Sequence, residues 1–225
     1  MSVNPVLKPL ECNPDVFNKF LTKLGINDYE FTDVFGLDPD LLAFVPRPVR
    51  ALLLVFPISE TYETFKTAQD ANYKHESNAC WSQQTVGNTC GTMAVLHALA
   101  NGVPNLGNGL GSDLIHQFQS LKEEDRHEFM ETNPEIIALH KELADSGESS
   151  VSDDLSCENH YVCLTKSGKD IVELDGRRKG PLLRKFGLKG DDILNDSVSI
   201  VKEYLDREKE SGNNDFAILA LVDKS

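Results

Sequence analysis

The pattern of hydrophobic and polar residues predicts mainly helices in the first two thirds of the chain. Asn13 followed by Pro14 is a typical helix start, and Gly25 is a typical helix end. Between these signals the apolar residues recur at helical spacing. They are Phe17, Phe20, Leu21 and Leu24.

Two further polar patterns mark helix starts. Ser120 with Glu123 forms a capping box, and Asn133 stands directly before Pro134. The remaining helices are expected over residues 39–45, 59–75, 90–101 and 192–208.

Strands are expected mainly in the last third of the chain. An apolar run over residues 49–56, interrupted at Arg50, predicts one earlier, buried strand. Residues 160–165 and 170–174 predict two strands joined by a tight turn at Ser167 and Gly168, and residues 216–222 predict a last one. Helices and strands do not alternate regularly, which favours an α+β fold. Without repeats or a clear linker, we expect a single domain over residues 1–225.

The composition and the cysteine spacing indicate the cellular compartment of the protein. Of 225 residues, 40 % are hydrophobic, and no apolar run reaches the roughly 18 residues of a transmembrane helix. The first residues do not resemble a signal peptide, and the odd number of cysteines without CxxC spacing disfavours a disulfide framework or a zinc site. We therefore expect free thiols and a cytoplasmic protein, with the nucleus as a second location. The cysteines are Cys12, Cys80, Cys90, Cys157 and Cys163.

The formal net charge of −14 narrows the choice of partners. Nucleic acids and anionic membranes would repel such a chain, so neither is expected to bind. A basic partner is favoured, although acidic character also serves solubility alone.

Cys90 is the cysteine with a chemical context. A thiol in the first turn of a helix faces unpaired N–H groups and the positive end of the helix dipole, which favour the thiolate. Thr89 can cap this helix, and Gly91 leaves room beside the sulfur for a substrate backbone. The alternative is a small buried side chain at a helix start. Cys163 lies within an apolar strand and is expected in the core.

A thiolate hydrolase needs a base near its nucleophile. His160 opens a strand directly after the polar segment 145–158, and catalytic groups often occupy such positions at the edge of a cleft. His97 lies two turns along the helix from Cys90 and points away from it. The remaining histidines considered lie among polar residues and are expected at the surface: His116, His127 and His140.

Two further side chains could complete such a site. If the strands after His160 pair as a hairpin, Asp175 comes near His160 and can fix its tautomer, although Asp before Gly176 is also an ordinary turn residue. Gln84 lies six residues before Cys90, and its amide could donate to an oxyanion together with the Cys90 backbone N–H.

Together these residues resemble the ubiquitin C-terminal hydrolase family. The resemblance rests on QTVGNTCGT over residues 84–92, on the strand-opening His160 and on the LDG that contains Asp175. It extends over nearly the whole chain, through PLECNPDVFNKFLTKLGI, FTDVFGLDPDLL, VPRPVRALLLVFP, HYVCLTK and VELDGRRKGP in order. The closest branch is the short one without a C-terminal extension.

The resemblance implies a function and a fold. It implies Cys90 as nucleophile, His160 as general acid and base, Asp175 as its orienting residue and Gln84 as oxyanion donor. The substrate would be ubiquitin, or a close ubiquitin-like modifier, carrying a small adduct or short peptide at its C-terminal glycine. No cofactor or metal is implied, and the chain is expected to act as a monomer.

The implied fold is a papain-like core with a central antiparallel sheet, flanking helices and a knotted backbone. The polar segment 145–158 would cross over the active site and exclude large leaving groups. The residues implied to meet the modifier are Pro9, Leu10, Glu11 and Asp33. Asn159 stands where an apolar residue is expected and would contact the substrate tail.

Two rival functions fit parts of the pattern. The chain could be a general papain-like peptidase or a thiol acyltransferase, but the acidic crossing segment argues against an open peptidase groove. It could also be a ubiquitin-binding protein with little turnover, against which the intact set of Cys90, His160, Asp175 and Gln84 argues.

Overall fold

An antiparallel six-stranded sheet forms the centre of the molecule. The computed structural model describes residues 5–72, 77–147, 155, 157–209 and 215–224. The strand order is β1-β6-β2-β3-β4-β5, and each neighbouring pair runs antiparallel. The strands are β1 (Tyr29–Asp33), β2 (Val49–Pro57), β3 (Asn159–Ser167), β4 (Asp170–Leu174), β5 (Leu182–Lys185) and β6 (Ala217–Asp223). The predicted α+β class is confirmed.

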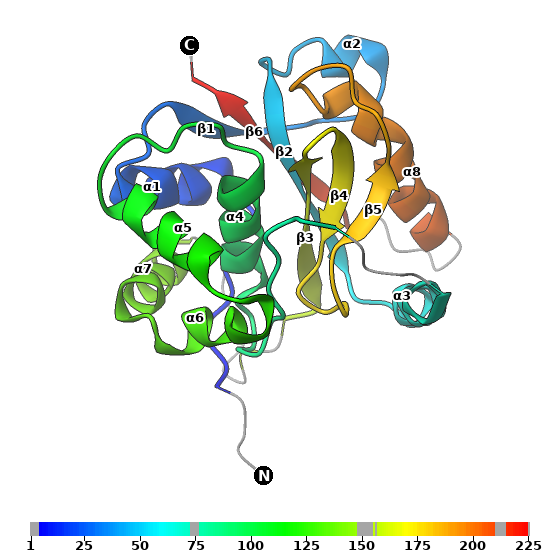
Figure 1. Cartoon of the computed structure of the whole chain (residues 1–225). Coiled ribbons are helices and arrows are strands. Elements are labelled where there is room, and N and C mark those ends of the chain that lie inside the picture. Colours follow the sequence, from blue (N-terminus) through cyan, green and yellow to red (C-terminus); the bar gives the residue numbers. More distant parts are fainter. Residues whose placement is uncertain (1–4, 73–76, 148–154, 156, 210–214, 225) are drawn as a thin grey trace.

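Helices cover both faces of the sheet (Figure 1). One face carries α1 (Pro14–Leu24), α4 (Cys90–Asn101), α5 (Leu110–Ser120), α6 (His127–Thr132) and α7 (Pro134–Asp145). The other face carries α2 (Pro39–Leu42), α3 (Glu60–Asn72) and α8 (Leu194–Lys209). Within the described part of the chain, no helix has both the length and the apolar character needed to cross a bilayer.

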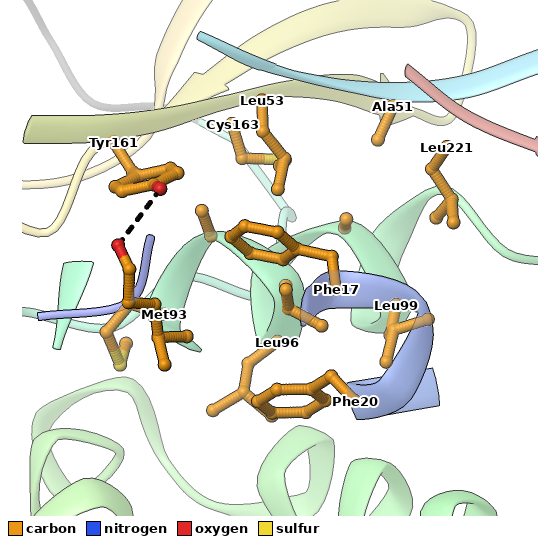
Figure 2. Close-up of a cluster of buried hydrophobic side chains, with 14 of the residues drawn as sticks. Phe17, Phe20, Ala51, Leu53, Met93, Leu96, Leu99, Tyr161, Cys163 and Leu221 are labelled. Atoms are coloured by element: carbon orange, nitrogen blue, oxygen red, sulfur yellow. Dashed lines mark hydrogen bonds between the residues drawn. The ribbon is translucent and has the colours of Figure 1, made fainter. Parts of the chain in front are cut away.

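Strand β2 separates two hydrophobic cores. Leu53 and Val55 point into the core that contains α1 and α4, whereas Leu54 and Phe56 point into the core that contains α8. Because helices cover both faces of the sheet, β2 is apolar at every position except Arg50 and does not alternate between apolar and polar residues. Figure 2 shows Phe17 of α1 between the side chains of the sheet and those of α4.

Helix α4 is enclosed by the first of these cores. All its residues from Cys90 to Leu99 are buried, and it lies between β3 and the other helices of its face. Such a helix needs apolar residues on every side, which explains its weak amphipathic pattern. The burial fixes the helix start, and therefore Cys90, relative to the sheet.

Most of the predicted helix starts are confirmed. The side chain of Asn13 accepts the Asp15 N–H at 2.9 Å, and Asn133 accepts two N–H groups at the start of α7. The capping box at Ser120 was wrong. Ser120 is the last residue of α5 and donates to the Gln117 carbonyl at 2.7 Å. Burial of Leu114, Ile115 and Phe118 explains why the helix lies before this serine rather than after it.

The predicted hairpin is also confirmed. Strands β3 and β4 pair antiparallel with Cys163 opposite Leu174 and Ser167 opposite Asp170. Gly168 in the turn has φ +60°, a left-handed conformation that glycine adopts without strain. This register brings the residues that follow Leu174 back toward the start of β3.

Candidate active site

Cys90 is the first residue of α4 and is enclosed by the core on that face of the sheet. It is 6 % exposed. Thr89 occupies the N-cap position, but its hydroxyl donates to the Val86 carbonyl at 2.8 Å, so the predicted side-chain cap was wrong. The space beside Gly91 holds Leu10, because an added Cβ there would lie 3.4 Å from the Leu10 side chain.

The hairpin places His160 against Asp175, as the sequence predicted. The His160 Nε2 and the Asp175 Oδ1 are 2.7 Å apart, and both residues are buried. Cys90 lies close enough to the imidazole to raise the pKa of His160 as well. Since Asp175 holds Nε2, Nδ1 is the ring nitrogen left for the sulfur. Thiol, imidazole and carboxylate therefore form one chain of polar contacts.

The charges in this chain stabilise one another. Burial by itself lowers the pKa of His160, but Asp175 and Cys90 outweigh it and raise this pKa to about 9. Burial by itself raises the pKa of Asp175, but the contact with His160 and the hydrogen bonds from Tyr62 and Arg177 hold it well below its ordinary value. At neutral pH the pair is therefore an imidazolium next to a carboxylate.

Asp175 accepts further hydrogen bonds that the sequence did not indicate. The Tyr62 hydroxyl donates to Oδ2 at 2.6 Å, and the Arg177 N–H donates to Oδ1 at 2.8 Å. The Trp81 indole donates to the Asp175 backbone carbonyl at 2.9 Å. Tyr62 lies in α3 and Trp81 precedes α4, so no local pattern connects them with Asp175. These contacts fix both oxygens of the carboxylate.

Tyr62→Phe tests this support. The change keeps the ring and leaves Oδ2 without its donor, so we expect it to lower the free energy of unfolding by about 1–3 kcal/mol and to reduce kcat. Denaturant unfolding and steady-state kinetics measure the two effects. Tyr29→Phe is a matched control, since Tyr29 lies in the edge strand β1. Unchanged kcat in Tyr62→Phe would contradict a positioning role.

Gln84 lies beside the residue that follows Asp175. Its backbone N–H donates to the Gly176 carbonyl at 2.9 Å, and a Cβ at Gly176 would lie 2.8 Å from the Gln84 Cβ. The side-chain Nε2 donates to the Val86 carbonyl at 3.1 Å. An amide carries two N–H donors, so this contact leaves one for another acceptor.

The residues predicted to meet the modifier lie in different environments. Leu10 is buried, and its carbonyl accepts the Tyr161 hydroxyl at 3.2 Å. Pro9, Glu11 and Asp33 are half-buried, and Asn159 is exposed beside His160. Burial raises the pKa of Asp33.

Two other histidines are also buried in the core around α4. His97 accepts the Ser82 N–H at 3.1 Å, and burial lowers its pKa to about 4, so it is a poor base as predicted. The surface position predicted for His140 was wrong. His140 is fully buried, 2.8 Å from the Thr92 hydroxyl and 2.9 Å from the Lys8 carbonyl. Its polar helical neighbours gave no sign that these two partners lie against it.

The geometry defines a class of protein. A thiol at a helix start that contacts an imidazole, itself held by a buried carboxylate, is the arrangement expected of a cysteine hydrolase. Among the residues that the structure describes, no group of three or more His, Cys, Asp and Glu side chains could hold a metal ion.

Comparisons with known proteins agree with this class. Residues 7–206 match the family described as ubiquitin carboxyl-terminal hydrolase, family 1. The chain is 36 % identical to ubiquitin carboxyl-terminal hydrolase isozyme L1 of Monodelphis domestica, covering 96 % of this chain and 97 % of the relative. It is 32 % identical to a ubiquitin carboxyl-terminal hydrolase of Drosophila melanogaster, covering 95 % and 96 %.

The fold agrees as well. The structure is similar to the Trichinella spiralis UCH37 catalytic domain bound to ubiquitin vinyl methyl ester, with a TM-score of 0.74 and 18 % identity over 97 % of this chain and 96 % of that one. The chain therefore belongs to the ubiquitin carboxyl-terminal hydrolase family 1, a family of cysteine peptidases.

Proposed function

We propose that this protein is a deubiquitinating thiol hydrolase that releases small adducts or short peptides from the C-terminal glycine of ubiquitin. The observation that carries the proposal is the placement of His160 between Cys90 and Asp175. A relative in structure was solved with a ubiquitin derivative bound, which supports ubiquitin as the partner. The net charge of −14 suits a modifier with a basic face.

The proposed reaction is two acyl transfers. The Cys90 thiolate attacks the glycine carbonyl, and the resulting oxyanion accepts hydrogen bonds from the Cys90 N–H and the Gln84 amide. As the tetrahedral intermediate collapses, the bond to the leaving group breaks and His160 protonates that group. Water, deprotonated by His160, then attacks the thioester and frees ubiquitin and the thiolate. Asp175 keeps the imidazole oriented throughout.

Further elements of the proposal concern recognition and overall organisation. Pro9, Leu10, Glu11, Asp33 and Asn159 would contact the modifier or its tail. We also propose a papain-like core with a knotted backbone, in one domain that acts as a monomer in the cytoplasm or nucleus. Residues 148–154 and 156 of the predicted crossing segment lie outside the described residues.

Hydrolysis of a fluorogenic ubiquitin C-terminal amide tests the function. We expect turnover by the wild-type protein and a mass increase on Cys90 when a ubiquitin with an electrophilic C-terminus is added. The second candidate is a protein that binds free ubiquitin with little turnover. Tight ubiquitin binding without amide hydrolysis would favour that candidate and reject the enzyme.

Gln84→Ala probes the oxyanion contact. We expect kcat for the fluorogenic amide to fall by roughly 10²–10³, the usual effect of removing one oxyanion donor, with little change in ubiquitin affinity. Stopped-flow hydrolysis and a binding titration separate the two quantities. Gln83→Ala is the matched control, because Gln83 is adjacent and exposed. A variant that loses affinity but keeps kcat would show that Gln84 only holds the bound tail.

A further inference from the structure

Helix α3 has little apolar surface with which to pack against the rest of the molecule. Figure 1 shows it at the lower right margin, beside the end of α8. Over residues 60–71, Tyr62 is the one buried residue. The guanidinium of Arg207 in α8 lies over the rings of Tyr62 and Phe65, at 5.6 and 4.7 Å from their centroids. Most helices are held by a packed apolar face, so the polar contacts of α3 have more influence on its position.

The buried residue of this helix is the donor to Asp175. The Tyr62 hydroxyl donates to Oδ2 at 2.6 Å, and Oδ1 of the same carboxylate contacts His160 at 2.7 Å. A movement of α3 would therefore withdraw a donor from the carboxylate that holds the imidazole. Whatever fixes α3 also fixes this hydrogen bond.

Arg178 attaches the same helix to the turn that begins at Asp175. Its backbone N–H donates to the Asp175 carbonyl at 3.1 Å, so the two residues are the first and fourth of one turn. Its guanidinium reaches α3, where Nη2 donates to Gln69 Oε1 and Nη1 to Asp70 Oδ1, both at 2.7 Å. Gln69 follows Tyr62 by about two helical turns and lies on the same side of α3. The helix is thus bonded to both ends of the turn.

The guanidinium is itself held by the sheet. The Arg178 side chain is fully buried, and its Nε donates to Glu173 Oε1 in β4 at 3.0 Å. Arg184 of β5 bonds the other oxygen of Glu173. Burying such charges carries a desolvation cost, so the network is weak evidence for stability. A planar guanidinium does, however, bond several acceptors in a fixed geometry. Arg178 therefore joins α3 to the central sheet in one defined position.

We propose that Arg178 is a positioning residue, which holds α3 against the turn at Asp175 and so keeps the Tyr62 hydroxyl on the Asp175 carboxylate. Its effect on catalysis rests on the proposed function. When α3 is released, the carboxylate loses this donor for part of the time, and it then holds the His160 imidazole less firmly in the orientation that faces Cys90.

The variant Gln69→Ala/Asp70→Ala removes the contact from the side of the helix. Both acceptors on α3 are lost, whereas Arg178 keeps its ion pair with Glu173, so no buried charge is left without a partner. Alanine has the highest helix propensity, so the substitutions do not weaken α3 itself. A change in the behaviour of α3 would therefore report the lost contact with Arg178.

Two further variants serve as controls. Gln69→Glu keeps an acceptor of the same length for Arg178 and is expected to behave as the wild type. Asp223→Ala removes a similar aspartate–arginine contact elsewhere, since Asp223 accepts hydrogen bonds from Arg50 at 2.7 and 2.6 Å. That contact lies at the opposite end of β2 from His160.

The first measurement is independent of ubiquitin. Amide hydrogen exchange is followed by mass spectrometry over residues 60–71. We expect exchange in this segment to rise about tenfold in Gln69→Ala/Asp70→Ala, because two hydrogen bonds from a charged group are lost, and to stay at the wild-type rate in both controls. Unchanged exchange over residues 60–71 in the folded double variant would overturn the proposal.

The second measurement tests whether Arg178 acts through Tyr62. We expect kcat for the fluorogenic ubiquitin amide to fall roughly 3–10-fold in Gln69→Ala/Asp70→Ala and to stay unchanged in both controls. In a Tyr62→Phe background the same two substitutions should lower kcat by less than about twofold, since the hydroxyl that they help to position is already absent. A general structural defect would multiply with Tyr62→Phe instead, and that result would reject the positioning role. Faster exchange in a protein that hydrolyses no ubiquitin derivative would uphold the hold of Arg178 on α3 and reject the proposed function alone.

Discussion

Cys90→Ala is expected to abolish hydrolysis of the fluorogenic ubiquitin amide while ubiquitin binding is retained. The sulfur is the atom that would bond to the substrate carbon, and loss of a nucleophile typically lowers kcat by about 10⁴-fold or more. Recognition would depend on other residues, and the side chain that is lost is small and enclosed in the core. Hydrolysis and calorimetric binding are measured on the same preparation.

Cys163 provides the matched control for this prediction. It is a fully buried thiol in β3, and burial raises its pKa far above the ordinary value, so it is an inert core residue. Cys163→Val has a similar volume and should keep activity close to wild type. Turnover in Cys90→Ala at the wild-type rate would reject the thioester mechanism, whatever the behaviour of Cys163→Val.

Asp175→Asn is expected to lower kcat by about 10⁴-fold, the usual effect of removing the charge that orients a catalytic histidine. The carboxylate makes the larger of the two contributions, with that of Cys90, that raise the pKa of His160 to about 9 against the effect of burial. With a neutral amide in its place, the largest contribution that opposes burial is lost, and we expect the pKa of His160 to fall below 7. The imidazole would then be neutral at pH 7 and would present no positive charge beside the sulfur of Cys90.

NMR titration of His160 measures this change directly. We expect the imidazole to stay protonated up to about pH 9 in the wild type and to titrate below pH 7 in Asp175→Asn. Asp170→Asn is the control, because Asp170 begins the strand that Asp175 follows, and its carboxylate accepts the Gly187 N–H at 2.9 Å. A His160 pKa that is the same in both variants would show that Asp175 does not control this imidazole.

The same pair makes stability depend on pH. The raised pKa of His160 contributes stability that is complete below its unfolded value of about 6.5 and is lost as pH rises through about 9. The lowered pKa of Asp175 contributes stability that is complete above its unfolded value and is lost as pH falls through the folded one. In Asp175→Asn both contributions should disappear, so its unfolding free energy should vary less between pH 6 and 9.

The sequence by itself determined the elements whose signals are local. Asn13 and Asn133 mark helix starts because their side chains accept N–H groups only two or three residues away. The helix from Cys90 to Asn101 and the hairpin that brings His160 near Asp175 follow equally from short stretches of chain. The contact of His160 with Asp175 was predictable for the same reason. The roles assigned to Cys90, His160, Asp175 and Gln84 rest on the family resemblance and stay predictions.

Only the tertiary structure decided the contacts between residues far apart in the sequence. Strands β1 and β5 are short edge strands, whose pairing was not indicated by their own residues. Tyr62 reaches Asp175 across 113 positions, and Asn88 reaches Leu155 across 67. The sequence predicted a surface position for His140, but in the fold this side chain contacts Thr92 and Lys8. The residues next to a side chain in the sequence do not indicate a partner that only tertiary packing brings to it. The contacts that hold the site together could therefore be found only in the structure.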